Sequence, residues 1–112
     1  MKLITAIIKP FKFDDVHDAL KAIGMEGITL TEVQGFGRQE GHAEIYRGAE
    51  YRTEYVPKIK IEVAVDDAKF DRAIEAIREA AYTGKIGDGK KFGNSLHRAV
   101  HIHSGENCDD VH

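Results

Sequence analysis

The stretch Thr83–Phe92, TGKIGDGKKF, combines the residue types that bind anions. Its three glycines allow backbone N–H groups to approach a ligand closely, and its three lysines supply positive charge. Phosphate is the anion that this combination suits. The stretch has neither the Walker spacing nor the dinucleotide spacing, so a glycine that ends a helix, followed by a hairpin, is the alternative interpretation. The residues of this stretch leave both interpretations open.

Histidines gather near the end of the sequence. If a last strand extends over residues 97–103, then His97, His101 and His103 share one side of it, and Cys108 and His112 follow. Imidazole and thiolate are ligands for zinc, copper or nickel. No standard zinc spacing is present, so surface residues without a metal are the alternative.

The composition bounds the protein class. The sequence has 112 residues, 42% of them hydrophobic, which predicts one domain, 1–112, with a modest core. Its 16 Lys+Arg and 19 Asp+Glu give a formal charge of −3. No sequence-wide basic field exists to hold nucleic acid or an anionic membrane, so any anion site must be local.

The sequence also bears on the compartment. No segment reaches the roughly 18 apolar residues of a membrane span, and residues 1–11 lack a cleavage pattern. The lone Cys108 cannot form an intrachain disulfide, which fits the reducing cytosol. We expect a cytoplasmic protein without membrane insertion.

Hydrophobic periodicity predicts the elements that hold these residues. Alternation or short apolar runs predict strands at 2–9, 27–35, 58–65 and 98–105, and helical spacing predicts helices at 12–24 and 66–84. Lys-Phe-Asp opens both helices, at 12–14 and 69–71, which suggests two βαβ halves. The order indicates an α+β fold, the ferredoxin-like βαββαβ sandwich, with both helices on one face of an antiparallel sheet. Burial of the other face against further copies would make a homo-oligomer.

The stretch 33–57 contains a long gap between the predicted strands at 27–35 and 58–65. A loop of roughly twenty residues inside a compact domain is usually functional or disordered.

Four strings in the sequence together carry a family resemblance: AIIKPFK, TEVQGFGRQEGHAEIYRGAEY, PKIKIEV and TGKIGDGK. They are collinear over nearly the whole chain, and the chain resembles the PII signal-transduction proteins, the GlnB/GlnK nitrogen regulators. The resemblance implies a homotrimer with ATP or ADP in each cleft between neighbours. It also implies a functional T-loop at about 37–55, a phosphate-binding loop at about 82–91 and a C-terminal loop at about 102–112.

The resemblance assigns roles to individual residues. Gln39 would bind a Mg²⁺ shared by the triphosphate and 2-oxoglutarate, and Lys58 would meet the distal carboxylate of 2-oxoglutarate. Tyr51 aligns with the family's uridylylation site, with an exposed, unmodified tyrosine as the alternative, while Tyr46 and Arg47 would contact an ammonium transporter. The nucleotide would be bound by Ile7, Thr29, Gly35, Gly37, Arg38, Glu62, Gly87, Asp88, Gly89, Lys90, His101 and His103.

The sequence departs from the family at two of these positions. Where relatives have arginine, apolar, arginine, this chain has His101-Ile102-His103. Histidine is mostly uncharged at neutral pH and lacks the bidentate fork, and each lost contact would cost about 1.5–3 kcal/mol. Triphosphate affinity should fall and become pH-dependent.

The resemblance favours a non-catalytic regulator of nitrogen and energy status that acts on target proteins. The targets would be an ammonium transporter, which could recruit the protein to the membrane, or a uridylyltransferase or adenylyltransferase. The alternative is a divergent sensor with altered nucleotide preference or a His/Cys metal site. RNA binding, which also uses βαββαβ proteins, requires more sheet aromatics than Phe36 and a basic surface. A phosphohydrolase would need an activated nucleophile, and none is recognisable.

Overall fold

The computed structural model describes residues 1–25, 27–38, 53–85 and 87–106. The strands are β1 (Lys2–Ile8), β2 (Thr29–Arg38), β3 (Thr53–Val65) and β4 (Gly89–Ser95). The α-helices are α1 (Phe13–Ala22) and α2 (Phe70–Ala81), and each follows one short 3₁₀ turn, η1 (Pro10–Lys12) and η2 (Asp67–Lys69). No helix in this described part is long and apolar enough to cross a membrane.

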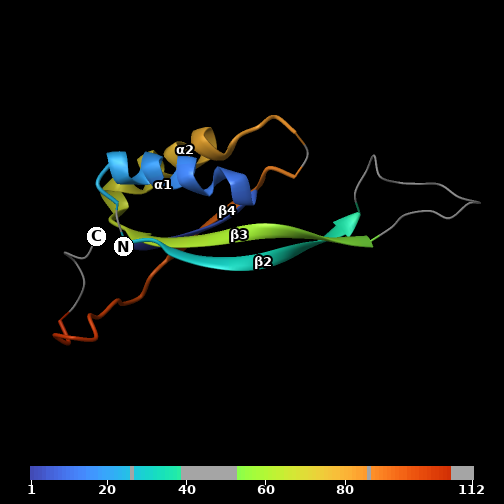
Figure 1. Cartoon of the computed structure of the whole chain (residues 1–112). Coiled ribbons are helices and arrows are strands. Elements are labelled where there is room, and N and C mark those ends of the chain that lie inside the picture. The colour runs from blue at the N-terminus through green and yellow to red at the C-terminus, as the bar shows by residue number, and fades with distance from the viewer. Residues whose placement is uncertain (26, 39–52, 86, 107–112) are drawn as a thin grey trace, which may run out of the picture.

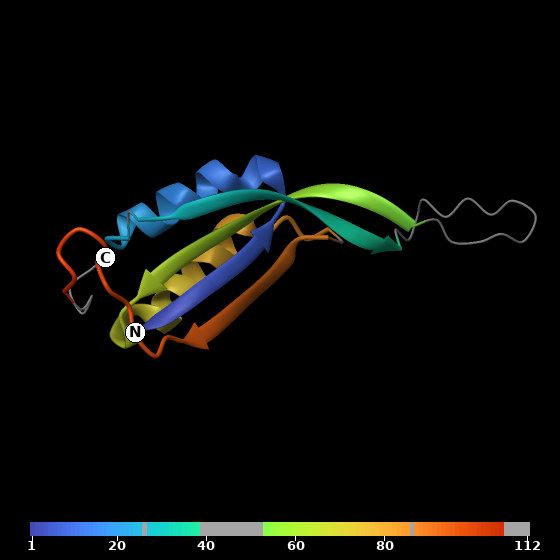
Figure 2. The ribbon, with the colours of Figure 1, turned by 90° about the horizontal axis from the view of Figure 1, so that it is seen from below.

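The four strands form one sheet in the order β2-β3-β1-β4, and all neighbours are antiparallel. Both helices lie on one face of the sheet (Figure 1), and the view from below shows β1 between β3 and β4 (Figure 2). The order βαββαβ and this strand arrangement confirm the predicted ferredoxin-like sandwich.

The core lies between the helices and the sheet. Alternate side chains of β1 and β3 point to the helices, because successive residues of a strand face opposite sides. Helical spacing supplies the other half of the core. The buried residues are Ile4, Ala6, Ile8, Val16, Leu20, Met25, Ile59, Ile61, Val63, Val65, Ala73, Ile77 and Ala81.

The opposite face of the sheet, called the open face below, is partly apolar. Leu3, Ile7 and Ala64 are half-buried there, and Phe92 of β4 is 46% exposed. The register places Phe92 opposite Thr5, in one row with Glu62 and Thr29. No helix of the described chain covers this face (Figure 1).

Strands β2 and β3 continue beyond the predicted ends at 35 and 58. They pair as far as Arg38 with Thr53, so part of the predicted long gap, residues 33–57, is regular hairpin. Pro57 argues against a strand in the sequence, because proline has no N–H to donate to a strand ladder, so the extension was not predicted. Proline is tolerated here because β1 ends at Ile8, opposite Ile59, and no other strand of the described chain pairs with that side of β3 beyond this point.

The predicted last strand, 98–105, is wrong. The last strand is Gly89–Ser95; residues 98–105 contain only an isolated bridge at Val100 and a turn at 102–104. The N–H of His101 donates to the carbonyl of Glu106 at 3.0 Å, and the N–H of Gly105 donates to that of His101 at 2.9 Å. The predicted alignment of His97, His101 and His103 along one strand is therefore also wrong.

Two glycines explain why β4 was missed. Gly89 has φ +111°, and a Cβ there would lie 1.8 Å from the carbonyl oxygen of Ile7. A Cβ on Gly93 would lie 2.4 Å from Cζ of Phe70. Both sites require glycine for close approach, so the strand lacks the alternating pattern that predicts one.

We expect Gly93→Ala to lower the free energy of unfolding by about 1–3 kcal/mol, because the added methyl displaces the Phe70 ring. Urea unfolding followed by circular dichroism measures this. Ser95→Ala, on the same strand, should change the value by less than about 0.5 kcal/mol. Phe70→Leu should restore part of the loss in the Gly93→Ala background. Equal stability of Gly93→Ala and the wild type would contradict the packing.

Candidate functional site

The glycine-rich loop opens on a pocket at the end of β1. Its volume is about 460 Å³, and Gly35 of β2 lies across from the loop. The lining residues are Ile7, Gly35, Lys58, Gly87, Asp88, Gly89 and Lys90, all from the set predicted to bind nucleotide or effector. Tertiary structure thus brings together residues from four separate parts of the sequence.

The carboxylate of Asp88 shapes the loop from inside. Its Oδ2 accepts the backbone N–H groups of Thr83 and Gly84, both at 3.0 Å. Its Oδ1 accepts the hydroxyl of Thr83 and lies 3.3 Å from Nζ of Lys9. With these bonds in place, Asp88 closes the turn and offers little to an anionic ligand.

These bonds favour the ionised form of Asp88. The hydroxyl of Thr83, followed by the N–H groups of Thr83 and Gly84 and by Lys9, holds the pKa of Asp88 far below its usual range. The carboxylate is therefore charged throughout the physiological range.

Ammonium groups outnumber carboxylates around the pocket. The Nζ of Lys58 donates to the carbonyl of Gly87, and the Nζ of Lys9 donates to the hydroxyl of Thr83 at 3.2 Å. Desolvation by burial and then the charge of Lys9 lower the pKa of Lys58, and Asp88 partly offsets them. Among the residues that the structure describes here, the Asp88 carboxylate lies with three cations, Lys9, Lys58 and Lys90, and an anion would balance their charge.

Other predicted nucleotide residues lie elsewhere. Thr29 and Glu62 pair with each other on the open face and do not line this pocket. Gly37 and Arg38 lie at the far end of β2, opposite Glu54 and Thr53.

His101 and His103 follow the opposite end of β4. The sheet ends there, where the N–H of Leu96 donates to the carbonyl of Met1 at 3.0 Å. Figure 2 shows this segment beside the N-terminus, at the end of the sheet away from the glycine-rich loop.

Several predicted residues lie outside the described residues: Gln39, Tyr46, Arg47, Tyr51, Cys108 and His112. Within the described ranges, no three His, Cys, Asp or Glu side chains are grouped as a metal site would require. The predicted histidine cluster therefore has no support from the residues that the structure describes.

Sequence reasoning missed Lys9 and Thr83 as parts of the site. Lys9 follows an apolar strand and precedes Pro10, which gives no sign of a role in binding. Thr83 offered a signal, since a threonine hydroxyl in a turn commonly accepts the backbone N–H two residues later, as it does here from Lys85 at 3.1 Å.

Comparison with known proteins gives consistent matches. The family model "Nitrogen regulatory protein P-II" matches residues 1–106. The chain is 58% identical over 106 residues to the nitrogen regulatory protein GlnK of Escherichia coli (strain K12), covering 95% of each chain. It is also 57% identical over 111 residues to the nitrogen regulatory protein P-II of Rhodospirillum rubrum, covering 99% of each.

We expect Asp88→Asn to lower the melting temperature at pH 7, because the amide cannot replace the carboxylate at Thr83, Gly84 and Lys9. The folded pKa is depressed, so the stabilisation is complete above the unfolded pKa of about 3.9 and is lost as the pH falls through the folded pKa. The difference in melting temperature between wild type and variant should therefore be constant above about pH 5 and shrink below about pH 4. Scanning calorimetry from pH 3 to 8 measures it.

Asp18→Asn, on an exposed position of α1, is the matched control and should leave the melting temperature nearly unchanged. Hydrogen exchange should report faster exchange at the amides of Thr83 and Gly84 in Asp88→Asn only. A difference that grows towards low pH would rule out the role given to the Asp88 carboxylate.

Proposed function

This chain belongs to the nitrogen regulatory protein P-II family, and on that premise we propose that it is a signalling protein that binds ATP or ADP. The nucleotide would control target proteins of nitrogen metabolism through residues 37–55. The observation that carries the proposal is the pocket of Ile7, Gly35 and residues 87–90, with its surplus of ammonium groups beside a glycine-rich backbone.

The phosphates would lie against the loop. Gly87 and Gly89 have φ of +90° and +111°, conformations that suit a backbone passing close to a ligand. Lys90 would supply charge at the rim, while Asp88 holds the loop closed from behind and leaves the phosphates to the N–H groups and lysines.

A homotrimer would complete the site. Thr29 lies six residues from Gly35 along β2, roughly 20 Å at 3.3 Å per residue. Residues this far apart on one chain can contact the same ligand when they come from two adjoining copies. Thr29 and Glu62 of one copy would then face the glycine-rich loop of the next copy. The half-buried Leu3, Ile7 and Ala64 of the open face are consistent with cover by further copies.

Lys58 is a suitable partner for a carboxylate such as that of 2-oxoglutarate. Its ammonium is partly desolvated and lies near that of Lys9, and both effects lower its pKa. A bound carboxylate would offset that cost. Gln39, four residues after Gly35 of the pocket, would bind a Mg²⁺ shared by the triphosphate and 2-oxoglutarate.

Nucleotide binding would affect the partner-binding segment through the β2–β3 hairpin. Gly35 lines the pocket, and β2 and β3 lead from it into residues 39–52. Nucleotide binding changes the conformation of that segment only if the nucleotide has different affinities for the alternative conformations. Tyr46 and Arg47 would contact targets such as an ammonium transporter, which recruits a cytoplasmic protein to the membrane, and Tyr51 would accept uridylylation.

We expect isothermal titration calorimetry to show saturable ATP or ADP binding. Lys90→Gln should weaken it about tenfold to a hundredfold, because a charge-assisted contact contributes about 1.5–3 kcal/mol. Lys85→Gln, in the same loop but outside the pocket lining, is the matched control and should bind nearly as the wild type does. Absence of binding for ATP, ADP and AMP, with and without Mg²⁺ and 2-oxoglutarate, would refute the proposal.

A second titration tests the nucleotide preference. His101→Arg with His103→Arg should raise ATP affinity at pH 7.5 by at least tenfold if these residues meet the phosphates across a trimer cleft. Sedimentation of the wild type should give the trimer mass. Unchanged affinity, or a monomer at the concentrations titrated, would count against the shared cleft.

A further inference from the structure

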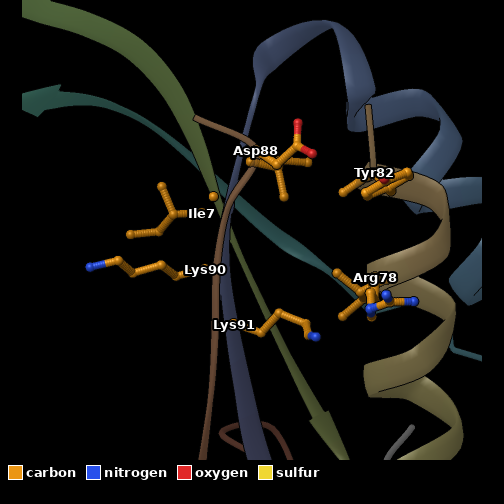
Figure 3. Close-up of a pocket in the computed structure, with 10 residues that line it drawn as sticks. Ile7, Arg78, Tyr82, Asp88, Lys90 and Lys91 are labelled. Atoms are coloured by element: carbon orange, nitrogen blue, oxygen red, sulfur yellow. The ribbon is translucent and has the colours of Figure 1, made fainter. Parts of the chain in front are cut away.

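A second pocket lies on the helix side of β4, between that strand and the end of α2 (Figure 3). Its volume is about 100 Å³. The lining residues are Ile7, Ile8, Ile77, Arg78, Ala81, Tyr82, Asp88, Gly89, Lys90 and Lys91. Neither the family comparisons nor the proposed nucleotide contacts assign a role to the residues that α2 contributes to this pocket.

The base of this pocket is apolar. Ile8 and Ile77 are each 1% exposed and Ala81 is 7% exposed, so all three belong to the core. An apolar group that replaced water against them would gain about 0.8 kcal/mol per methylene. The base therefore favours a hydrocarbon group.

Two cations stand at the rim. Lys91 is on the helix-facing side of β4, paired with the buried Ala6, so its stem lies along the core edge. In Figure 3 its ammonium points towards α2, where Arg78 on the helix and Tyr82, just after its end, also line the pocket. Within the described part of the chain, Lys91 has no ion-pair partner.

The nearby carboxylates do not neutralise this pair. Arg78 lies 3.4 Å from Glu75, but both side chains are more than half exposed, and such a pair contributes little. The guanidinium has five N–H donors, so others remain for a ligand. Asp88 points away from Lys91 in Figure 3 and is held by Thr83, Gly84 and Lys9.

We propose that this pocket binds a small carboxylate with a short hydrocarbon chain, of about three or four carbons. The carboxylate lies between Lys91 and Arg78, and the chain contacts Ile8, Ile77 and Ala81. The size follows from the volume, because a cavity of about 150 Å³ accepts benzene and this one is smaller. Inorganic phosphate satisfies the cations but leaves the apolar base in contact with water.

The pocket is separate from the nucleotide pocket, although they share a wall. Ile7, Asp88, Gly89 and Lys90 line both. Figure 3 shows the side chains of Ile7 and Lys90 on the side of β4 away from Lys91 and Arg78. The inference therefore does not rest on the proposed function, and its test uses no nucleotide.

The test is a ¹⁵N–¹H NMR titration of the full chain at pH 7 with sodium acetate, propionate and butyrate at constant ionic strength. Saturable shifts are expected at the amides of Gly89 and Lys91 and at Tyr82. Affinity should rise about fourfold per added methylene up to butyrate, the ratio that corresponds to 0.8 kcal/mol. Hexanoate should gain nothing further, since its chain exceeds the pocket.

Lys91→Met and Arg78→Gln should each weaken butyrate binding at least tenfold. Arg72→Gln on α2 and Lys85→Met in the loop are matched controls that remove a charge outside the pocket, and both should bind as the wild type does. Unchanged butyrate affinity in Lys91→Met, or shifts as strong with inorganic phosphate as with butyrate, would overturn the proposal in favour of an adventitious ion. Absence of saturable shifts in the wild type, as when a neighbouring copy fills the pocket, would overturn it too.

Discussion

The pairing of β4 with β1 at Gly89 is the constraint on which the rest of the molecule depends. The Ile7 carbonyl is so close that a Cβ at residue 89 would lie 1.8 Å from it. This contact fixes where the glycine-rich loop ends and brings residues 87–90 beside the end of β1. Both pockets exist because the strand begins at that point, with one pocket on each side of it.

The charged groups around the glycine-rich loop have different roles. Asp88 uses its negative charge on the hydroxyl and amides of the loop itself, which leaves the lysines around it without a full counter-charge. This arrangement would favour the proposed phosphate ligand, because a free carboxylate at the mouth would repel it. The resemblance assigned Asp88 to nucleotide binding together with Gly87, Gly89 and Lys90, and the structure shows that its carboxylate binds the backbone of the loop.

The two faces of the sheet differ in how completely they are covered. The helix face is closed by α1 and α2 and has a complete core, apart from the small pocket beside β4. The open face holds the half-buried Leu3, Ile7 and Ala64 in the rows on either side of the row that contains Thr29 and Glu62. A homotrimer of the proposed kind would cover that face and complete the nucleotide contacts in one step, which links assembly to ligand binding.

The sequence by itself determined the order of elements, both helices and three of the strands, because alternation and helical spacing reflect which side chains enter the core. The four strings also identified the family and most of the pocket residues before their proximity was visible. Only the tertiary structure decided the position of β4, since Gly89 and Gly93 are dictated by the approach of Ile7 and Phe70 from distant parts of the chain. It alone assigned Asp88 to the loop backbone and brought Arg78 to Lys91, because local periodicity contains no information about which side chains meet across a sheet edge.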